Sequence, residues 1–513
     1  MNLPRTATPS TSAAETLAAI DMGSNSFRLE IAQLHRGQYR RQVYLKETVR
    51  LGAGLDEQSM LTEEAMQRGL QCLQRFAAQL IEFPPTQVRA VATQTLREAR
   101  NRNIFLERAQ LALGYPIEVI SGREEARLIY AGVARLQSST APRLVIDIGG
   151  RSTEMILGSG RKPLRAESFQ VGSVSLSLRY FPDGEFTAEA FRAAQVAAGA
   201  ELEEALTLFA RAQSRPTWID ALGSSGTVGA VSQILAASGV SDGSITLDGL
   251  RWCIKQCLSA GHSSRLNLPG LKEDRRAVVA GGLCILYTLL THFDIDTLLP
   301  TKGALRQGVI FDLSERLEAA QQDLARGHDM RDQSVHAMQT RFGVDLQQAQ
   351  RVQRMALVLH GQLSPRAARE RQRELSWAAS LHEIGMMISH HDHHRHTAYV
   401  LAHVDAPGFS QNQLRRLGDL ALGQRGGLRK LEPQFGDEDL LWQLLALRLA
   451  VIKCHARSAV DEGAIRIRRT GRQITVAMDK HWASAHPRAL YLMQEELEAW
   501  RRLNGVLDLQ LNA

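Results

Sequence analysis

The chain has 513 residues, of which 44% are hydrophobic and 22% are charged. One hydrophobic core rarely serves a chain of this length, so we expect two to four domains of an ordinary globular protein. No apolar stretch approaches the roughly 20 residues that a membrane-spanning helix needs. Residues 1–15 lack the apolar segment of a secretory signal and are expected to form a loose tail.

The net charge of +7 favours a polyanionic partner, such as nucleic acid or an acidic phosphate polymer. Aromatic residues make up only 5% of the chain and do not alternate with basic ones, as they do on surfaces that stack bases, so we expect no nucleic-acid partner. The cysteines are few and scattered, and Cys253 and Cys257, which could meet across a helix turn, lack further zinc ligands. We therefore expect reduced thiols in a cytoplasmic protein, with a peripheral place at the inner face of the membrane as the alternative.

The first half of the chain alternates strands and helices. Strands are predicted at 17–21, 26–34, 40–51, 88–93, 117–120, 144–148 and 217–222, and helices at 62–80, 103–113 and 122–136. Beyond about residue 313 helix follows helix, at 314–326, 345–363, 374–385 and 439–456, and a hairpin follows at 464–478. These changes predict α/β domains at 13–130 and 131–313, a helical domain at 314–448 and a small α+β domain at 449–513.

Two segments of the first half resemble each other. Residues 18–34 (AAIDMGSNSFRLEIAQL) and 144–160 (LVIDIGGRSTEMILGSG) both show an apolar run, then Asp-x-Gly-x-x-Ser, then a second strand. Such a segment most often forms a tight hairpin turn between two strands. Because the match heads two successive α/β segments, it suggests a duplicated fold with a cleft between its halves.

Three turns rich in glycine and serine, at 23–26, 149–152 and 223–227, offer backbone and hydroxyl donors. Singly, each is more often plain turn chemistry, but together they describe a cleft that wraps a phosphate chain. The cradle would consist of Gly23, Ser24, Asn25, Ser26, Gly149, Gly150, Arg151, Ser152, Gly223, Ser224, Ser225 and Gly226. Asp21 and Asp147 lead two of these turns and would repel phosphate, a conflict that a Mg²⁺ ion between them would remove.

Hydrolysis of a phosphoanhydride also needs a group that orients and deprotonates water. Glu125 near the start of a predicted helix and Glu154 on the strand after the second turn are candidates. Taken alone, Glu125 is better explained as an acid that the helix dipole favours, and Glu154 as a solvent-facing strand residue.

Several motifs in fixed order resemble those of the exopolyphosphatase / guanosine pentaphosphate phosphohydrolase family. They are DMGSNSFRL (21–29), ATQTLREARN (92–101), ISGREEARLI (120–129), DIGGRSTE (147–154), GSSGT (223–227) and KGALRQGV (302–309). Residues 380–410 are similar to the HD-related helical domain of the long members. The resemblance implies duplicated actin-like domains, as in sugar kinases and chaperone ATPases, then an all-α HD-like domain and a small α+β domain.

The resemblance also implies a Mg²⁺-dependent attack of water on a terminal phosphoryl group. By motif, Glu125 would be the general base, Glu154 would position the water or the metal, and Arg97 would contact substrate phosphate. Asp147, with Asp21 and Glu154, would hold Mg²⁺. A homodimer is implied for the long members.

Two positions depart from the family pattern. Arg151 stands where relatives usually have a small residue; we expect an ordinary φ there, and a side chain that either contacts phosphate in the cleft or lies in solvent. Lys302 stands where relatives often have a small or acidic residue, and would make the rim of the cleft more basic.

The histidine-rich run at 390–396 invites a metal-site interpretation. The expected His-Asp doublet is His382-Glu383 here, and LALRLAVIKC lacks the aspartate of a metal-binding HD domain. We therefore predict a scaffold whose histidines and arginines border a basic channel for polyanion. The basic runs PRAARERQRE and AIRIRR would join that surface, or be plain solvated faces.

The favoured expectation is an exopolyphosphatase that releases orthophosphate from the end of inorganic polyphosphate, as a Mg²⁺-dependent hydrolase. Its nearest alternative is hydrolysis of guanosine pentaphosphate by the same site. A kinase or chaperone of the same superfamily is a different-class alternative, against which a water-activating glutamate argues. A non-catalytic sensor of polyphosphate or nucleotide is the third.

Overall fold

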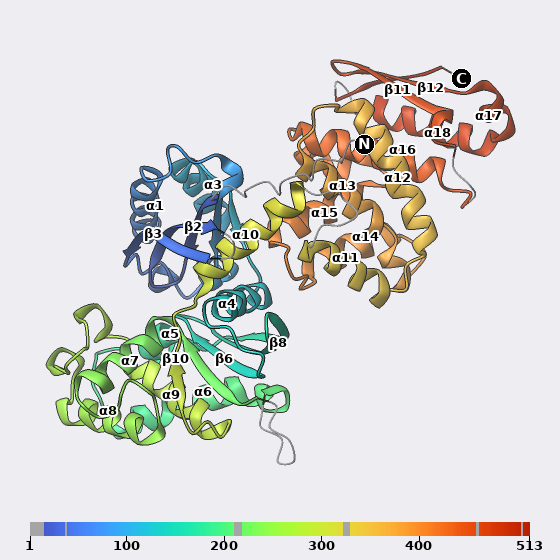
Figure 1. Cartoon of the computed structure of the whole chain (residues 1–513). Helices are drawn as coiled ribbons and strands as arrows, with labels where there is room; N and C mark the ends of the chain where they lie inside the picture. Colours follow the sequence, from blue (N-terminus) through green and yellow to red (C-terminus); the bar gives the residue numbers. More distant parts are fainter. Residues whose placement is uncertain are drawn as a thin grey trace, which may run out of the picture. The chain divides into compact units, whose positions relative to one another are not determined.

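The computed structural model describes residues 15–35, 38–209, 218–321, 329–457, 461–503 and 506–512, and the expected N-terminal tail lies almost wholly outside this part. The chain divides into two compact units, Met1–Gln322 and Asp323–Ala513 (Figure 1). No described helix is both long and apolar enough to cross a membrane.

The first unit contains two five-stranded sheets with the same strand order. In each sheet three antiparallel strands are followed by two strands parallel to the first one. The first sheet has the order β3 (Gln38–Glu47), β2 (Phe27–His35), β1 (Glu15–Met22), β4 (Val88–Ala92) and β5 (Ile117–Val119). The second has the order β8 (Lys162–Phe169), β7 (Thr153–Ser159), β6 (Arg143–Ile148), β9 (Asp220–Ser224) and β10 (Leu298–Pro300). This repetition confirms the duplicated α/β fold.

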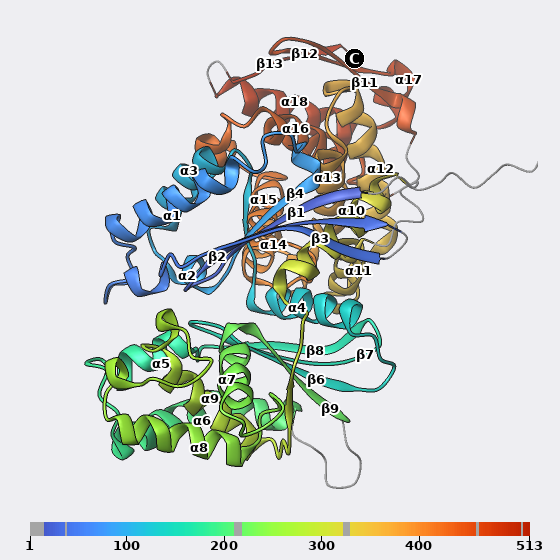
Figure 2. The ribbon, with the colours of Figure 1, turned by 60° about the vertical axis from the view of Figure 1, so that its left-hand side comes forward.

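Helices form layers on and between these sheets (Figure 2). One core joins the facing sides of the two sheets to α4 (Gly122–Leu136) and α10 (Leu305–Gln321), which therefore lie between the sheets. A second core packs α1 (Glu63–Ala77) and α3 (Arg102–Leu113) on the outer face of the first sheet. A third covers the second sheet with α5 (Ser173–Tyr180), α6 (Ala188–Phe209), α7 (Ser225–Ala237), α8 (Leu247–Ala260) and α9 (Val279–His292). The short helix α2 (Gln94–Glu98) follows β4 directly.

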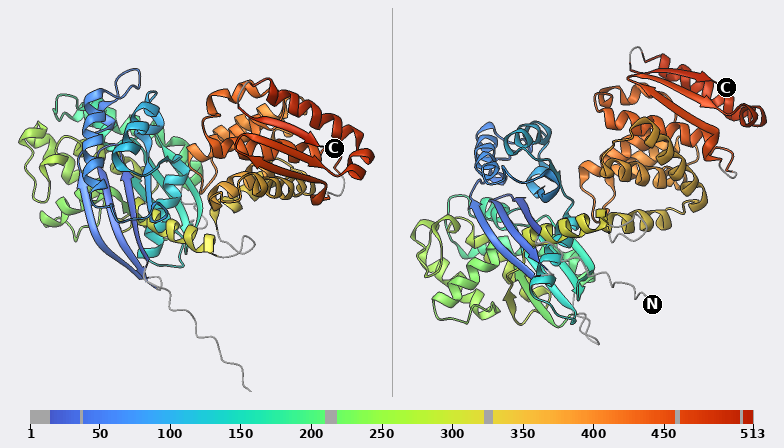
Figure 3. Two further views of the ribbon diagram at one scale, coloured as in Figure 1. Left: turned by 90° about the horizontal axis from the view of Figure 1, so that it is seen from above. Right: turned by 45° about the horizontal axis from the view of Figure 1, so that its top comes forward.

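The second unit is mainly helical and ends in a small sheet (Figure 3). Its helices are α11 (Met330–Arg341), α12 (Leu346–Leu363), α13 (Arg369–Leu381), α14 (His393–His403), α15 (Gln411–Gly423), α16 (Glu438–Lys453), α17 (Lys480–Ala485) and α18 (Pro487–Arg501). The predicted hairpin is present as β11 (Ile465–Thr470) and β12 (Gln473–Met478), and β13 (Asp508–Asn512) adds a parallel strand that we did not predict. Helices and sheet share one hydrophobic core.

The expected domain boundaries after residues 130, 313 and 448 fall inside α4, α10 and α16. Helix α10 begins at Leu305, nine residues before the helix predicted at 314, because its apolar positions face the layer between the sheets. A division of the chain into four domains stays a prediction, whose limits would have to move to adjoining loops.

Candidate active site

A cavity of about 290 Å³ lies in the first unit, where elements of both halves meet. Its walls come from the turn after β1, the turn after β6, the start of α7 and the segment that leads into α10. The predicted site residues that line it are Asp21, Gly23, Ser24, Asn25, Ser26, Glu125, Asp147, Gly149, Gly150, Ser152, Ser225 and Gly226. Arg97, Arg151, Glu154, Gly223 and Ser224 are not among the lining residues.

The two strand-to-strand turns have the same geometry. A Cβ at Gly23 would lie 3.1 Å from the carbonyl oxygen of Ser26, and one at Gly149 would lie 3.0 Å from that of Ser152. Neither glycine has a positive φ, so each is needed for this close approach and not for a left-handed backbone. The residue pairs predicted from the internal repeat therefore occupy equivalent positions.

The third turn begins α7 and is strained. Ser225 has a φ of 88°, which a residue with a side chain rarely adopts, and such strain is concentrated at functional sites. At the next position a Cβ on Gly226 would lie only 2.2 Å from a guanidinium nitrogen of Arg275. Glycine thus lets a cationic side chain lie directly on the turn, beside the donors of the helix N-terminus.

Cross-strand partners differ between the two halves. Asp21 on β1 lies opposite Arg28 on β2, whereas Asp147 on β6 lies opposite Glu154 on β7. Arg28 donates to Asp21 at 3.0 Å. The repeat thus places a cation beside one aspartate and a second acid beside the other.

Burial shapes the protonation of the acids in the second half. It raises the pKa of Asp147 to about 6, against the opposing effects of the Ser224 hydrogen bond and of Arg28. It also raises the pKa of Glu154 well above its usual value, with further contributions from the charges of Glu125 and Asp147. Glu154 is 1% exposed and accepts a hydrogen bond from Ser168 at 2.8 Å, so its interpretation as a solvent-facing residue is wrong.

Glu125 lies in the first turn of α4, which Ser121 caps by accepting from the backbone N–H of Glu124. Its carboxylate lines the cavity and accepts from Nη1 of Arg97 at 2.8 Å. Burial raises the pKa of Glu125 to about 7, and the charge of Arg97 opposes the rise. A carboxylate with a pKa near neutrality suits a general base that works at cellular pH.

Arg97 and Arg151 are placed differently from our expectation. Arg97 donates to Glu125, Gln94 and the carbonyl oxygen of Ile120, so its contact with substrate phosphate stays a prediction. Arg151 has an ordinary φ, as expected. Its side chain neither lines the cavity nor lies free in solvent, because Glu98 holds it at 2.6 Å in an ion pair.

Cationic side chains that sequence analysis missed complete the lining. They are Arg28, Lys46, Arg275 and Arg306, and they join Lys302, which faces the cavity as its basic character suggested. Burial and the charge of Arg275 lower the pKa of Lys46, and burial and the charge of Arg28 lower the pKa of Arg275. A multiply charged anion would relieve this mutual repulsion. Arg28 and Arg306 carried a sequence signal, as parts of DMGSNSFRL and KGALRQGV, whereas Lys46 and Arg275 carried none.

The acids suit Mg²⁺ only in combination with substrate. In the described residues, no three His, Cys, Asp or Glu side chains are grouped so that they could hold a metal ion by themselves. Mg²⁺ is usually bound through one or two carboxylates together with waters and substrate phosphates. Asp21 and Asp147, both buried at the cavity, fit that use, and the charge of Asp21 contributes to the raised pKa of Asp147.

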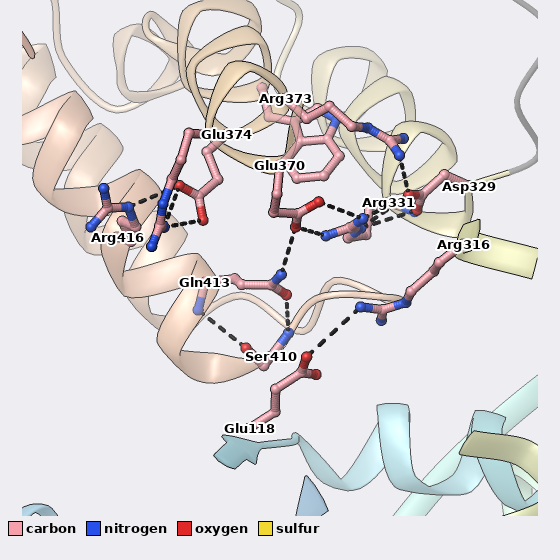
Figure 4. Close-up of polar contacts among 12 residues, drawn as sticks. Glu118, Arg316, Asp329, Arg331, Glu370, Arg373, Glu374, Ser410, Gln413 and Arg416 are labelled. Carbon is pink, nitrogen blue, oxygen red and sulfur yellow. Dashed lines mark hydrogen bonds and ion pairs between the residues drawn. The ribbon is translucent and has the colours of Figure 1, made fainter. Parts of the chain in front are cut away.

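The basic channel expected in the second unit does not include His393 and His394. Both side chains are buried, and burial lowers the pKa of each to about 4, so they are neutral parts of the interior. The run PRAARERQRE is largely engaged in ion pairs (Figure 4). Arg373 pairs with Asp329 at 2.8 Å. Arg371 pairs with Glu374 at 2.9 Å.

Comparisons with known proteins agree with this arrangement. Residues 31–317 match the Ppx/GppA phosphatase family, and residues 330–499 match domain III of the Ppx/GppA phosphatases. The guanosine-5′-triphosphate,3′-diphosphate pyrophosphatase of Vibrio cholerae serotype O1 is 37% identical over 94% of this chain and 96% of its own length. The protein of the same name from Vibrio vulnificus is also 37% identical over the same shares.

Two solved structures share the fold of the first unit. An exopolyphosphatase-like protein, 26% identical, covers 60% of this chain and 99% of its own with a TM-score of 0.54. An exopolyphosphatase from Cytophaga hutchinsonii, also 26% identical, covers 58% of this chain and 98% of its own with a TM-score of 0.52. The chain therefore belongs to the Ppx/GppA phosphatase family and is a phosphoanhydride hydrolase.

Proposed function

We propose that the protein hydrolyses guanosine-5′-triphosphate,3′-diphosphate, releasing the terminal phosphate of its 5′-triphosphate. The observation that carries this proposal is the position of Glu125, a buried carboxylate that faces the same cavity as the glycine turns and cations of both halves. Our sequence-based expectation placed polyphosphate first. Relatives 37% identical over 94% of the chain are named for the nucleotide, and this reverses the order.

The residues divide the reaction among them. Glu125 takes a proton from water as its oxygen attacks the terminal phosphorus, and the bond from that phosphorus to the bridging oxygen breaks. Orthophosphate leaves, and guanosine-5′-diphosphate,3′-diphosphate remains. Glu154 does not line the cavity itself, but Ser168 holds it close enough to Glu125 and Asp147 for their charges to contribute to its raised pKa, and through these two acids it would orient the water or the metal. Asp21 and Asp147 would hold Mg²⁺, which when bound neutralises charge on the phosphate oxygens.

The cations of the cavity support a substrate with more phosphate than one terminal group. Gly226 and the strained Ser225 place the start of α7 under Arg275. Arg28 lies close enough to contribute to the lowered pKa of Arg275, and Arg275 lies close enough to contribute to that of Lys46. A nucleotide that carries phosphates at both 5′ and 3′ positions would bring negative charge to the glycine turns and to this group together.

Inorganic polyphosphate is the second candidate, since one solved relative at 26% identity is named as an exopolyphosphatase, another as exopolyphosphatase-like, and the same cations suit a polymer. Measured side by side with Mg²⁺, kcat/KM should be higher for guanosine-5′-triphosphate,3′-diphosphate than for long polyphosphate. The reverse ratio would restore polyphosphate as the main substrate. The homodimer implied by the resemblance is checked by the mass of the protein in solution.

A further inference from the structure

Arg151 connects the two halves of the first unit. It belongs to the turn between β6 and β7, the second-half turn that lines the cavity through its glycines. Its Nε and Nη2 lie 2.8 and 2.6 Å from Oε2 of Glu98 on α2, and its Nη1 donates to the carbonyl oxygen of Gly52 at 3.2 Å. Glu98 and Gly52 both belong to the first half, so this side chain spans from one half to the other.

Glu98 is connected to Arg97 through the side-chain amide of Gln94. Its second oxygen, Oε1, accepts from the amide Nε2 of Gln94 at 2.6 Å. The amide oxygen of Gln94 in turn accepts from Nε and Nη2 of Arg97, at 2.9 and 2.5 Å. The amide has one orientation in which its NH₂ faces a carboxylate and its oxygen faces a guanidinium, so Gln94 is fixed from both sides.

Arg97 ends the series at the proposed base. Its remaining nitrogen, Nη1, donates to Oε2 of Glu125 at 2.8 Å and to the carbonyl oxygen of Ile120 at 2.9 Å. A continuous series of side-chain contacts therefore runs from the second-half phosphate turn to the carboxylate that faces the cavity. Hydrogen bonds in such a series orient one another, and the loss of one partner affects groups further along.

We propose that Arg151 is a positioning residue for Glu125. Arg151 holds Glu98, Glu98 and Gln94 hold Arg97, and Arg97 fixes the carboxylate of Glu125 relative to the turn that cradles phosphate. This inference rests on the proposed role of Glu125 as the general base.

Two other roles fit the geometry less well. A direct phosphate contact is not favoured, because each guanidinium nitrogen of Arg151 already has a partner in the first half and the side chain does not line the cavity. A purely stabilising role would contribute little, since the two side chains are 23% and 25% exposed and water screens a pair of that kind. Removal of Arg151 should leave the fold intact.

Without Arg151, Glu98 loses its cation and is left beside Gln94 and Arg97. The guanidinium of Arg97 can then turn toward Glu98 and away from Glu125, which leaves the base without the group that orients it. Misplacement of a catalytic group lowers the rate of the chemical step more than the affinity for substrate. The expected signature is a fall in kcat with little change in KM.

The test compares Arg151→Ala, Glu98→Gln and the double variant with the native chain, using guanosine-5′-triphosphate,3′-diphosphate and long polyphosphate as probes. Each single variant should lose ~10-fold in kcat with KM nearly unchanged, and the double variant should lose no more than the worse single one. Arg151→Lys should restore part of the loss, because an ammonium can still reach Glu98.

Arg123→Ala provides a matched control. Arg123 lies two residues before Glu125 on the same helix, and its nitrogens contact Glu167 at 2.8 and 2.9 Å in an ion pair outside the series. Its kcat should stay native. Thermal melting of every variant verifies folding, and Glu98→Gln and Arg151→Lys keep the test valid if Arg151→Ala is unstable.

Three results would overturn the proposal. One is a rise in KM for both probes with native kcat in Arg151→Ala, which would assign Arg151 to phosphate binding. Another is multiplication of the two single effects in the double variant, and the third is native kcat in both single variants. A Glu125→Gln variant assayed alongside separates the proposed function: native turnover in that variant refutes the base itself, whatever the Arg151 variants do.

Discussion

Glu124 and Glu125 are consecutive residues of α4 and face opposite surroundings. Glu125 lines the cavity and pairs with Arg97, whereas Glu124 is fully buried and pairs with Arg127 at 2.7 Å. Adjacent residues of a helix project about 100° apart, so one turn supplies both the cavity and the layer between the sheets with a carboxylate. In the doublet EE of GREEARLI, Glu125 therefore serves the cavity and Glu124 the buried layer between the sheets.

Glu125→Gln should abolish most of the activity without loss of fold. The amide keeps the shape of the side chain and an acceptor for Arg97 but cannot take a proton, and loss of a general base typically costs 10²- to 10⁴-fold, so we expect a fall in kcat of roughly that size. Steady-state phosphate release measures it. Glu124→Gln is the control: it should lower the melting temperature more than Glu125→Gln does while keeping more of the activity.

Activity should fall on the acidic side of neutrality. Since Glu125 has a pKa near 7 and acts only when deprotonated, kcat/KM should decrease tenfold per pH unit well below that value. Arg97 lowers this pKa, so Arg97→Gln should move the acidic limb to higher pH. A profile of kcat/KM between pH 5 and 9 tests both statements, and an acidic limb that stays in place in Arg97→Gln would contradict the assigned pairing.

A buried ion cluster between the sheets should carry much of the stability of the first unit. Asp312 on α10 accepts from Arg89 at 2.6 Å and from Arg316 at 2.7 Å, and it also pairs with Arg127. These charges hold the pKa of Asp312 well below its usual value against the effect of burial. Asp312→Asn leaves buried guanidinium groups without their shared partner, so unfolding free energy should fall by about 3–5 kcal/mol.

Chemical denaturation at neutral pH measures this loss. Glu315→Gln supplies the comparison. Like the pair of Asp312 with Arg127, the pair of Glu315 with Arg135 joins α10 to α4, but the side chain of Glu315 is 45% exposed. Its removal should cost about 1 kcal/mol or less. Equal losses in the two variants would show that the buried cluster is no more important than a surface pair.

Site residues could be predicted from the sequence only where the pattern that marks them lies within one contiguous segment. Asp21 and Asp147 were found because a strand, a turn and a second strand are contiguous in sequence, and the repeated spacing marked them. Lys46 and Arg275 were missed because β3 and a short 3₁₀ helix bring them to the cavity only in the folded chain. The orientation of Arg151 depends on Glu98, and no local pattern links those two residues. Strand β13 was missed because its partner β12 pairs with it in parallel, across the intervening helices.

Arg275 should determine substrate affinity more than rate. Its side chain packs against the turn that starts α7. Burial and the nearby charge of Arg28 lower its pKa. Arg275→Gln removes a charge that an anionic ligand would otherwise share, so KM for guanosine-5′-triphosphate,3′-diphosphate should rise ~10-fold or more, with kcat changed less. The salt dependence of KM should become shallower, because fewer charges contact the substrate. Lys272→Gln removes the same charge from an exposed position three residues earlier and should leave KM within about twofold of native. Equal effects of the two substitutions would mean that Arg275 acts only through the overall positive potential of this face, and not through contact with the bound anion.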